Sequence, residues 1–229
     1  MKINKVHCLF EQSGTFKEAF KKLGITAEDY DILNDFGKTD HEIDIFSEID
    51  KAYEGKLSIF DEIGETDLVF AFFPCTRFEA KIPLGFRGEL WQQKNWSDEQ
   101  RLEYSIKLHE ELHRLYVLIS KLFLICMRGG WRMIVENPYT QPHYLTTYFP
   151  VKPSLIDKNR LLNGDYFKKP TQYWFVNCEP EQNLLFESME WVEPQVVEKS
   201  SIDKTIERKV QRSLIHPQYA ERFIKQYVI

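Results

Sequence analysis

The chain has 229 residues and a formal net charge of −5, with 43% hydrophobic and 28% charged residues. This length can bury one substantial core, so we expect a single domain that spans residues 1–229. The acidic balance argues against a strongly basic nucleic-acid-binding protein, although local basic patches can still contact phosphates.

Neither a membrane-spanning segment nor a secretion signal is evident in the sequence. The longest apolar candidate, residues 115–127, is interrupted by Ser120 and Lys121, and the first residues lack the apolar stretch of a signal peptide. Four scattered cysteines indicate neither a disulfide framework nor a CxxC zinc motif. We therefore expect a cytoplasmic protein that has no membrane partner.

The first third of the chain alternates strand and helix signals. Residues 6–10 predict a short strand, and residues 15–23 predict a helix with one apolar face that ends at Gly24. Residues 29–32 and 43–46 have the pattern of short strands that end near acidic residues. Residues 68–73 give the strongest strand prediction, because this apolar run begins after Asp67 and stops at Pro74.

The rest of the chain continues the alternation. Residues 98–126 predict a long amphipathic helix, with Ser97 as its N-cap and Gly129-Gly130 as its stop. Residues 131–135 and 172–176 predict further strands, and residues 207–227 are expected to be helical with a break at Pro217. Strands that alternate with helices indicate an α/β protein with a doubly wound, mostly parallel sheet and helices on both faces.

Polar residues follow the first three predicted strands. Ser13 and Gly14 form a turn at the start of a helix, where backbone N–H groups favour anionic or polar ligand groups. Asp31 stands where a doubly wound fold places an acid for ribose hydroxyls, and Asp44 occupies the analogous position in the third predicted strand. Each residue alone is typical of an ordinary turn, but together they outline a site for an adenosine-containing ligand.

Cys75 lies just beyond the strongest predicted strand, at the sheet edge where open α/β sheets bind ligands. A thiol there can act as a nucleophile, because thiolate is reactive and its pKa responds to its surroundings. The alternative is a small buried hydrophobe, the usual state of a free cysteine. Motifs elsewhere in the chain favour the nucleophile.

A carboxylate follows the neighbouring apolar strand. Glu136 comes directly after the run of residues 131–135 and precedes Asn137 and Pro138. If the two strands are adjacent in the sheet, Glu136 and Cys75 share one pocket. A thiol and a glutamic acid together are what nucleophilic addition to a pyrimidine ring requires, since the thiolate adds to the ring and the acid stabilises charge on the ring nitrogen.

A second motif suggests different chemistry. His109 and His113 belong to an HExxH sequence, which on a helix presents two imidazoles and a glutamate to a zinc ion. No third ligand motif follows, and the two histidines flank an ordinary apolar stripe of the predicted helix. A zinc peptidase is therefore a remote alternative, and we expect no metal site.

Basic residues are concentrated in two later segments. A solvated residue is the simplest interpretation of each one, but two basic segments beside one site would form a phosphate-contacting surface. The middle segment contains Lys152, Lys158, Arg160, Lys168 and Lys169, and the tail contains Lys204, Arg208, Lys209, Arg212, Arg222 and Lys225.

Taken in order, these motifs resemble those of the cytosine-5 DNA methyltransferase family, and most closely its compact phage and prophage methylase-like proteins. Residues 10–16, with Phe10, Ser13 and Gly14, are similar to the FxGxGG methyl-donor loop of the family. Pro74 and Cys75 resemble its Pro-Cys nucleophile motif, and Glu136 and Asn137 its Glu-Asn-Val motif. Residues 212–220 resemble the C-terminal segment that packs beside the donor loop in the family.

The resemblance implies a Rossmann-like class I methyltransferase fold that binds S-adenosylmethionine and acts on nucleic acid, with DNA the expected substrate. Cys75 would attack cytosine and Glu136 would hold the ring nitrogen, on a base flipped out of the helix or taken from a single strand. The resemblance assigns the cofactor to Phe10, Ser13, Gly14, Asp31, Asp44 and Pro74, and substrate contacts to Asn137, Lys168, Lys169 and Gln172.

The sequence also departs from the family pattern. Phe73 replaces the first proline of Pro-Pro-Cys, the donor loop has one glycine, and the arginine pair expected near Gln172 is absent. Too few residues separate Val176 from Glu207 for a full target-recognition domain, so a partner chain or a second copy would have to supply recognition. A non-catalytic methylase-like module that binds nucleic acid or the cofactor remains the main alternative.

Overall fold

The computed structural model describes residues 2–140, 143–195, 208–211 and 213–229. The strands are β1 (Lys5–Leu9), β2 (Thr26–Asp31), β3 (His41–Glu42), β4 (Leu68–Ala71), β5 (Arg132–Pro138), β6 (Leu155–Asp157) and β7 (Thr171–Val176). The α-helices are α1 (Thr15–Lys22), α2 (Ile45–Tyr53), α3 (Ile82–Phe86), α4 (Asp98–Gly129), α5 (Tyr144–Tyr148), α6 (Arg208–Gln211) and α7 (Pro217–Tyr227). Short 3-10 helices are η1 (Ile59–Glu62), η2 (Trp91–Gln93) and η3 (Arg160–Asn163).

The seven strands form one mixed sheet in the order β3-β2-β1-β4-β5-β7-β6. Strands β1 to β5 pair in parallel, with Leu9 opposite Ala71 and Ala71 opposite Val135. Strand β7 is antiparallel to both of its neighbours. The predicted α/β class with a mostly parallel sheet is confirmed.

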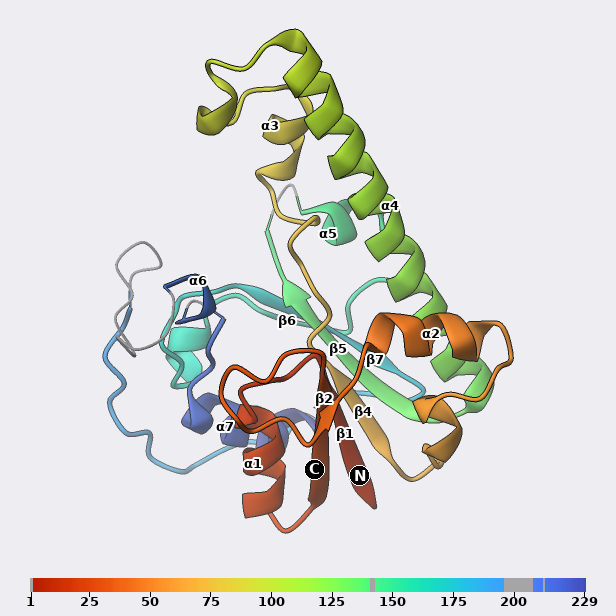
Figure 1. Cartoon of the computed structure of the whole chain (residues 1–229). Coiled ribbons are helices and arrows are strands. Elements are labelled where there is room, and N and C mark those ends of the chain that lie inside the picture. Colours follow the sequence, from red (N-terminus) through yellow and green to blue (C-terminus); the bar gives the residue numbers. More distant parts are fainter. Residues whose placement is uncertain (1, 141–142, 196–207, 212) are drawn as a thin grey trace.

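Helices cover both faces of this sheet, as predicted (Figure 1). On one face α1 and α7 pack together, with Phe16 of α1 near Phe223 of α7. On the other face α2 and α4 bury Ile49 and Ile119 against the sheet. Strand β4 lies between the two layers and is completely buried, which explains its uninterrupted apolar sequence.

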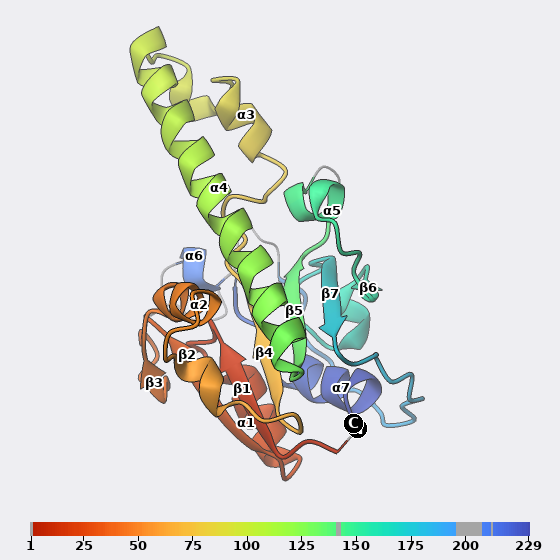
Figure 2. The same ribbon diagram turned by 90° about the vertical axis from the view of Figure 1, so that its right-hand side faces the viewer.

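Helix α4 begins where the sequence predicted, because Ser97 accepts a hydrogen bond from the Gln100 N–H and Gln100 accepts one from the Ser97 N–H. It ends at Gly129 and is followed by the C-cap Gly130, whose φ of 71° suits glycine. Its N-terminal part and α3 extend beyond the carboxyl edge of the sheet (Figures 1 and 2). No helix in the described ranges has both the length and the apolar character needed to cross a membrane.

Three element predictions were wrong in detail. Residues 43–46 are not a strand, because the Asp44 side chain accepts hydrogen bonds from Phe46 and Ser47 N–H and caps α2 instead. Residues 136–138 do not end the fifth strand but extend it along β7. The break predicted at Pro217 is present but lies before this residue, which begins α7. The start predicted at Glu207 lies outside the described residues, as do Lys204 and Arg212.

Candidate functional site

The candidate site lies at the carboxyl edge of the sheet, where the direction of the strand order changes. The chain passes from β1 through α1 on one face and returns to β4 after α2 on the other, so β1 and β4 flank the switch point. Open α/β sheets bind ligands at such points. The turn after β1 and the segment that holds Cys75 after β4 therefore meet at one place.

Cys75 is partly buried in the segment that follows β4. Burial raises the pKa of its thiol, the positive charge of Lys169 lowers it, and the carboxylates of Glu136 and Glu79 raise it further. The net effect is a raised pKa, so the resting group is the thiol. Cys75 therefore interacts electrostatically with Glu136 and Lys169, and the strand before Cys75, β4, pairs with β5, which carries Glu136.

Glu136 lies on β5 beside a buried arginine that the sequence analysis did not single out. Glu136 is 8% exposed and its Oε1 atom is 3.9 Å from Nη1 of Arg160. Arg160 is 1% exposed and forms a 2.5 Å ion pair with Asp165. Within the described part of the chain, Glu136 Oε1 has no hydrogen-bond partner, so it is free to accept or share one with a ligand.

Asn137 and Gln172 face each other across β5 and β7 and are both fully buried. Asn137 donates a 2.7 Å hydrogen bond to the carbonyl of Phe73, which ties β5 to the segment that holds Cys75. Gln172 donates to the carbonyl of Pro138 and to the hydroxyl of Thr146. Both amide side chains are therefore buried, and their hydrogen bonds hold neighbouring segments of the protein together at the site.

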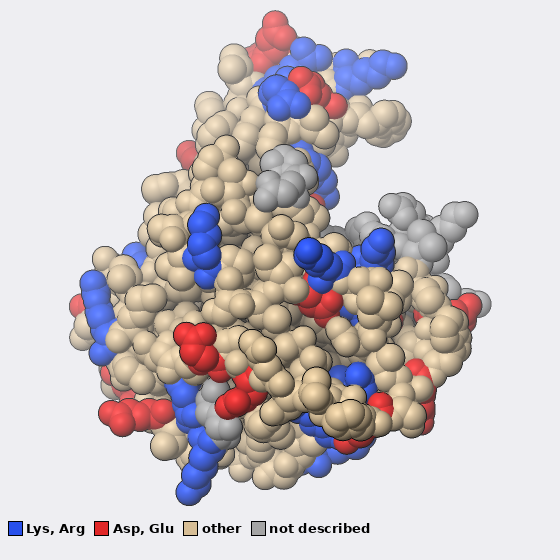
Figure 3. Space-filling model, turned by 180° about the vertical axis from the view of Figure 1, so that it is seen from behind, with Lys and Arg blue, Asp and Glu red and all other residues tan. Residues whose placement is uncertain are grey.

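One basic residue of the middle segment does not reach the surface. Arg160 is buried, so its expected role as part of a phosphate-contacting face was wrong. Lys168 is exposed and Lys169 is half-buried beside the site. On the face shown in Figure 3, Lys and Arg occur in small groups interspersed with Asp and Glu.

Aromatic rings lie beside the turn after β1, on the side of the site where the resemblance expects the methyl donor (the donor side). Phe10 follows β1 with a φ of 60°, a conformation uncommon for a residue with a side chain. Its ring centroid is 5.5 Å from that of Phe73 and 5.5 Å from that of Phe46. Arg114 of α4 lies over the Phe46 ring, 5.9 Å from its centroid. Phe10 and Phe46 are half-buried and Phe73 is buried, so the first two rings remain accessible to a ligand.

The two acids predicted for the donor side occupy different positions. Asp31 ends β2, is 9% exposed and accepts a 2.8 Å hydrogen bond from the Leu33 N–H. Burial raises the pKa of Asp31, and hydrogen bonds from Leu33 and Ile32 partly offset that effect. Asp44 is exposed and caps α2, so it does not end a strand as Asp31 does.

The helix after the Ser13-Gly14 turn already has a carboxyl group of the chain at its N-terminus. Glu11 is 6% exposed, and its carboxylate accepts hydrogen bonds from the Phe16 N–H at 2.6 Å and the Lys17 N–H at 3.2 Å. Gly14 has a φ of 68°, which favours glycine, and the Ser13 hydroxyl is hydrogen-bonded to that of Thr15. The first N–H groups of α1 are thus occupied by the chain itself, a contact that the sequence analysis missed.

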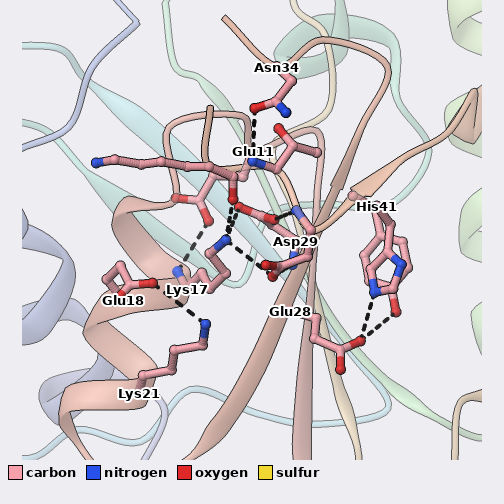
Figure 4. A network of polar contacts seen from close by, with 12 residues as sticks. Glu11, Lys17, Glu18, Lys21, Glu28, Asp29, Asn34 and His41 are labelled. Atoms are coloured by element: carbon pink, nitrogen blue, oxygen red, sulfur yellow. Dashed lines mark hydrogen bonds and ion pairs between the residues drawn. The ribbon is translucent and has the colours of Figure 1, made fainter. Parts of the chain in front are cut away.

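A buried ion-pair network fills the space beneath this turn (Figure 4). Lys17 points from α1 toward β2, with its Nζ atom 2.9 Å from Asp29 and 3.1 Å from Asp40. Burial lowers the pKa of Lys17, but its two carboxylate partners outweigh this effect and the pKa is raised. The network fixes residues 38–40 against α1 and so defines the floor of the donor side.

The HExxH motif does not form a metal centre with neighbouring residues. His109 Nδ1 donates a 2.8 Å hydrogen bond to the carbonyl of Ser105, and its ring stacks on Phe86 with centroids 4.1 Å apart. Across the described ranges, no three His, Cys, Asp or Glu side chains come together as a metal ion would require. The structure gives the zinc alternative no support.

No model of a known protein family matches the sequence, and no curated protein is significantly similar to it. The function is therefore argued from the site. The sequence analysis did not consider Glu11 and took Arg160 for a surface residue, and the two differ in how far their positions could have been anticipated. An acid just before a helix is a known N-terminal signal, whereas nothing local marks Arg160 as buried.

Proposed function

We propose that the chain is an S-adenosylmethionine-dependent methyltransferase that acts on carbon 5 of cytosine in nucleic acid. One observation carries the proposal. Cys75 follows β4 and Glu136 lies on the adjacent β5, close enough for the carboxylate to raise the pKa of the thiol. A nucleophile and a hydrogen-bonding acid on neighbouring strands at a topological switch point suit addition to a pyrimidine ring.

The sheet is compatible with the Rossmann-like methyltransferase fold that the motifs imply. The order β3-β2-β1-β4-β5 is that of a doubly wound sheet, and the reversed β7 completes it on one side. The α7 helix packs beside α1, where the resemblance expects the C-terminal segment.

The donor side suits a cofactor with an adenosine moiety and a positive charge. Phe10 and Phe46 would contact the flat adenine ring, and Asp31 would accept from the ribose hydroxyls. Ser13, Gly14 and Pro74 would border the cofactor through the turn after β1 and the segment after β4, and Asp44 would lie near the adenine. S-adenosylmethionine, when bound, supplies an electrophilic methyl group.

The chain's own residues then handle the base. The Cys75 thiol loses its proton to solvent, and the thiolate forms a bond to carbon 6 of cytosine. Glu136 takes up a proton from solvent, donates it in a hydrogen bond to ring nitrogen 3 and so stabilises the electron pair displaced from the bond between carbons 5 and 6. After methylation, carbon 5 gives up its proton to solvent and the bond to Cys75 breaks, which restores the aromatic ring and the free thiolate.

Nucleic acid would reach the site as a flipped or single-stranded base. Lys169, whose charge acts on Cys75, and the exposed Lys168 would contact phosphates near that base. With little sequence between β7 and α6, we propose that target recognition is weak or comes from a partner chain. DNA is the favoured substrate on the motifs alone.

Methyl transfer from radiolabelled S-adenosylmethionine to mixed DNA and RNA tests this function. We expect label in DNA with the wild-type chain and none with Cys75→Ser. S-adenosylhomocysteine should raise the melting temperature of both proteins, since a ligand that binds only the folded state stabilises it. Asp31→Ala should reduce that rise. If neither label nor a thermal shift occurs, the proposal is wrong.

A specific observation favours a second candidate, a non-catalytic methylase-like module. The N-terminus of α1 is filled by Glu11, and burial keeps Cys75 in its thiol form. A thermal shift with S-adenosylhomocysteine but no methyl transfer to any nucleic acid would favour this module over the enzyme.

A further inference from the structure

A small pocket between α3 and α5, the α3–α5 pocket, lies beyond the carboxyl edge of the sheet (Figures 1 and 2). Its volume is about 60 Å³, room for roughly four water-sized groups. Apolar and aromatic side chains form most of its wall, among them Ile82, Phe86, Phe78 and Tyr144. The ring planes of Phe78 and Tyr144 are 25° apart, with centroids separated by 6.3 Å. The pocket therefore suits one edge of a flat group.

His143 is the polar side chain that sets the α3–α5 pocket apart. It is 1% exposed, and among the described residues neither of its ring nitrogens has a hydrogen-bond partner. Its backbone is held in place, because its N–H donates to the Thr140 carbonyl and its carbonyl accepts from the N–H and the hydroxyl of Thr147. It stands at the N-cap position of α5, but its side chain makes no cap hydrogen bond. A buried imidazole without partners costs free energy that a ligand in the pocket would offset.

The chemistry of the pocket favours a neutral ligand. Burial lowers the pKa of His143 to about 4, so near pH 7 the ring is neutral and offers one N–H donor and one acceptor nitrogen. Arg77, which also lines the pocket, forms an ion pair with Glu111. Glu79, on the same wall, pairs with Lys81 at 2.8 Å. A planar, uncharged group with a donor and an acceptor on one edge fits these features, and a nucleobase is such a group.

The pocket adjoins the segment that holds Cys75. The Phe78 N–H donates to the Cys75 carbonyl at 2.8 Å, and the Phe78 carbonyl accepts from the Tyr144 N–H at 2.9 Å. The Glu79 carboxylate lies near enough to both places that its charge acts to raise the pKa of Cys75 and that of His143. A strand of nucleic acid that presents one base to Cys75 therefore brings an adjacent base within reach of the α3–α5 pocket.

We propose that the α3–α5 pocket receives the edge of the nucleobase next to the target cytosine, with His143 hydrogen-bonded to that edge. Tyr148 lines the pocket and is 65% exposed, so its ring stacks on the part of the base that stays outside. This inference rests on the proposed function, to which it adds a second contact with the substrate. Contact with one neighbouring base gives little sequence selectivity, in keeping with the short connection between β7 and α6.

Fluorescence anisotropy of single-stranded DNA with one cytosine, in the presence of S-adenosylhomocysteine, tests the pocket. An abasic site on either side of the cytosine removes one neighbouring base at a time. For the wild type, one of the two abasic sites should raise the dissociation constant about fivefold or more, the size of a lost base–aromatic contact. His143→Leu should bind the intact DNA as weakly as the wild type binds that abasic DNA, and the abasic site should then change little further.

Two variants and a control separate binding from folding. His143→Leu keeps a similar volume and removes two unsatisfied polar atoms, so its melting temperature should equal or exceed that of the wild type. Tyr148→Ser changes an exposed residue and should likewise reduce the effect of the abasic site. His41→Leu, which replaces an exposed histidine of β3, is the matched control and should bind both DNAs as the wild type does.

The outcomes distinguish this pocket from the proposed function as a whole. Wild-type binding that neither abasic site weakens, or an abasic effect that is unchanged in His143→Leu, would overturn the pocket. Covalent trapping at Cys75 by 5-fluorocytosine without any effect of the neighbouring bases would leave the proposed function intact and refute the pocket alone. No binding to any oligonucleotide, with no adduct, would overturn the proposed function and this inference with it.

Discussion

Cys75 lies among charges that decide how readily its thiol loses a proton. Burial and the carboxylates of Glu136 and Glu79 raise its pKa, and Lys169 opposes them. Thiolate is the reactive form, so any reaction at Cys75 should accelerate as pH rises toward this raised pKa. Lys169 is then the residue that keeps the thiol accessible to deprotonation.

Replacing Lys169 with Gln should slow the alkylation of Cys75 by iodoacetamide. Loss of the positive charge raises the thiol pKa further, and an upward shift of half a unit would reduce the thiolate fraction about threefold. Mass spectrometry of the Cys75 peptide at a fixed pH measures the rate. Lys168→Gln is the matched control and should react like the wild type, because Lys168 is exposed. Equal or faster alkylation in Lys169→Gln would contradict this account.

Glu11 is a buried carboxylate whose protonation is linked to folding. Burial raises its pKa to about 7, against an ordinary value of 4.5, although hydrogen bonds from Phe16 and Lys17 lower it in part. The folded state therefore binds a proton more tightly than the unfolded state does. The resulting stabilisation is complete below pH 4.5 and is lost as the pH rises through about 7.

As the pH rises from 4.5 to about 7, the free energy of unfolding of the wild type should accordingly fall relative to that of Glu11→Gln. The difference amounts to about 3 kcal/mol at most, from the size of the pKa shift. Urea denaturation of both proteins at a series of pH values measures it. The control variant Glu18→Gln changes an exposed residue of α1, and its free energy of unfolding should vary with pH as that of the wild type does. A difference between wild type and Glu11→Gln that is constant with pH would refute the linkage.

At the scale of elements, one side chain fixes the nucleophile segment to the neighbouring strand. Asn137 at the end of β5 donates to the carbonyl of Phe73, two residues before Cys75. Both groups are buried, so the carbonyl has no access to bulk water when the amide is removed. Asn137 is therefore a positioning residue for Cys75.

Asn137→Ala should destabilise the protein by about 1–3 kcal/mol, the cost of an unsatisfied buried polar group. It should also increase hydrogen exchange locally in residues 72–78. Asn183→Ala, which removes an exposed amide bonded to the carbonyls of Lys225 and Ile229, serves as the control and should leave this segment unchanged. Unaltered exchange around Cys75 in Asn137→Ala would show that the contact does not hold the segment.

Long or strongly patterned elements were predictable from the sequence, whereas short ones were not. The apolar run of β4 and the capped 32-residue helix α4 carry their own signals. Residues 43–46 alternate like a strand, but the hydrogen bonds that Asp44 accepts at the start of α2 outweigh that weak pattern. The antiparallel direction of β7 could not be predicted from its own residues either, because the apolar sequence of a buried strand is alike in parallel and antiparallel pairing.

At the scale of the whole molecule, the candidate site depends on contacts between distant parts of the chain. Its prediction required only that the strands ending near Cys75 and Glu136 be neighbours, which the sheet provides. Arg160, Asp165 and Lys17 could not be placed in this way. Their burial follows from how η3, α7 and the segment before β3 close around the sheet, and composition alone marked Arg160 as a surface residue.

The most direct test of the central claim is covalent trapping by DNA that contains 5-fluorocytosine, in the presence of S-adenosylmethionine. Fluorine at carbon 5 cannot leave as a proton does, so the bond between Cys75 and carbon 6 should persist. The account predicts a denaturation-resistant adduct at Cys75 in the wild type, none in Cys75→Ser, and slower formation in Glu136→Gln with the fold intact. An adduct that survives in Cys75→Ser, or no adduct with any DNA despite bound cofactor, would contradict it.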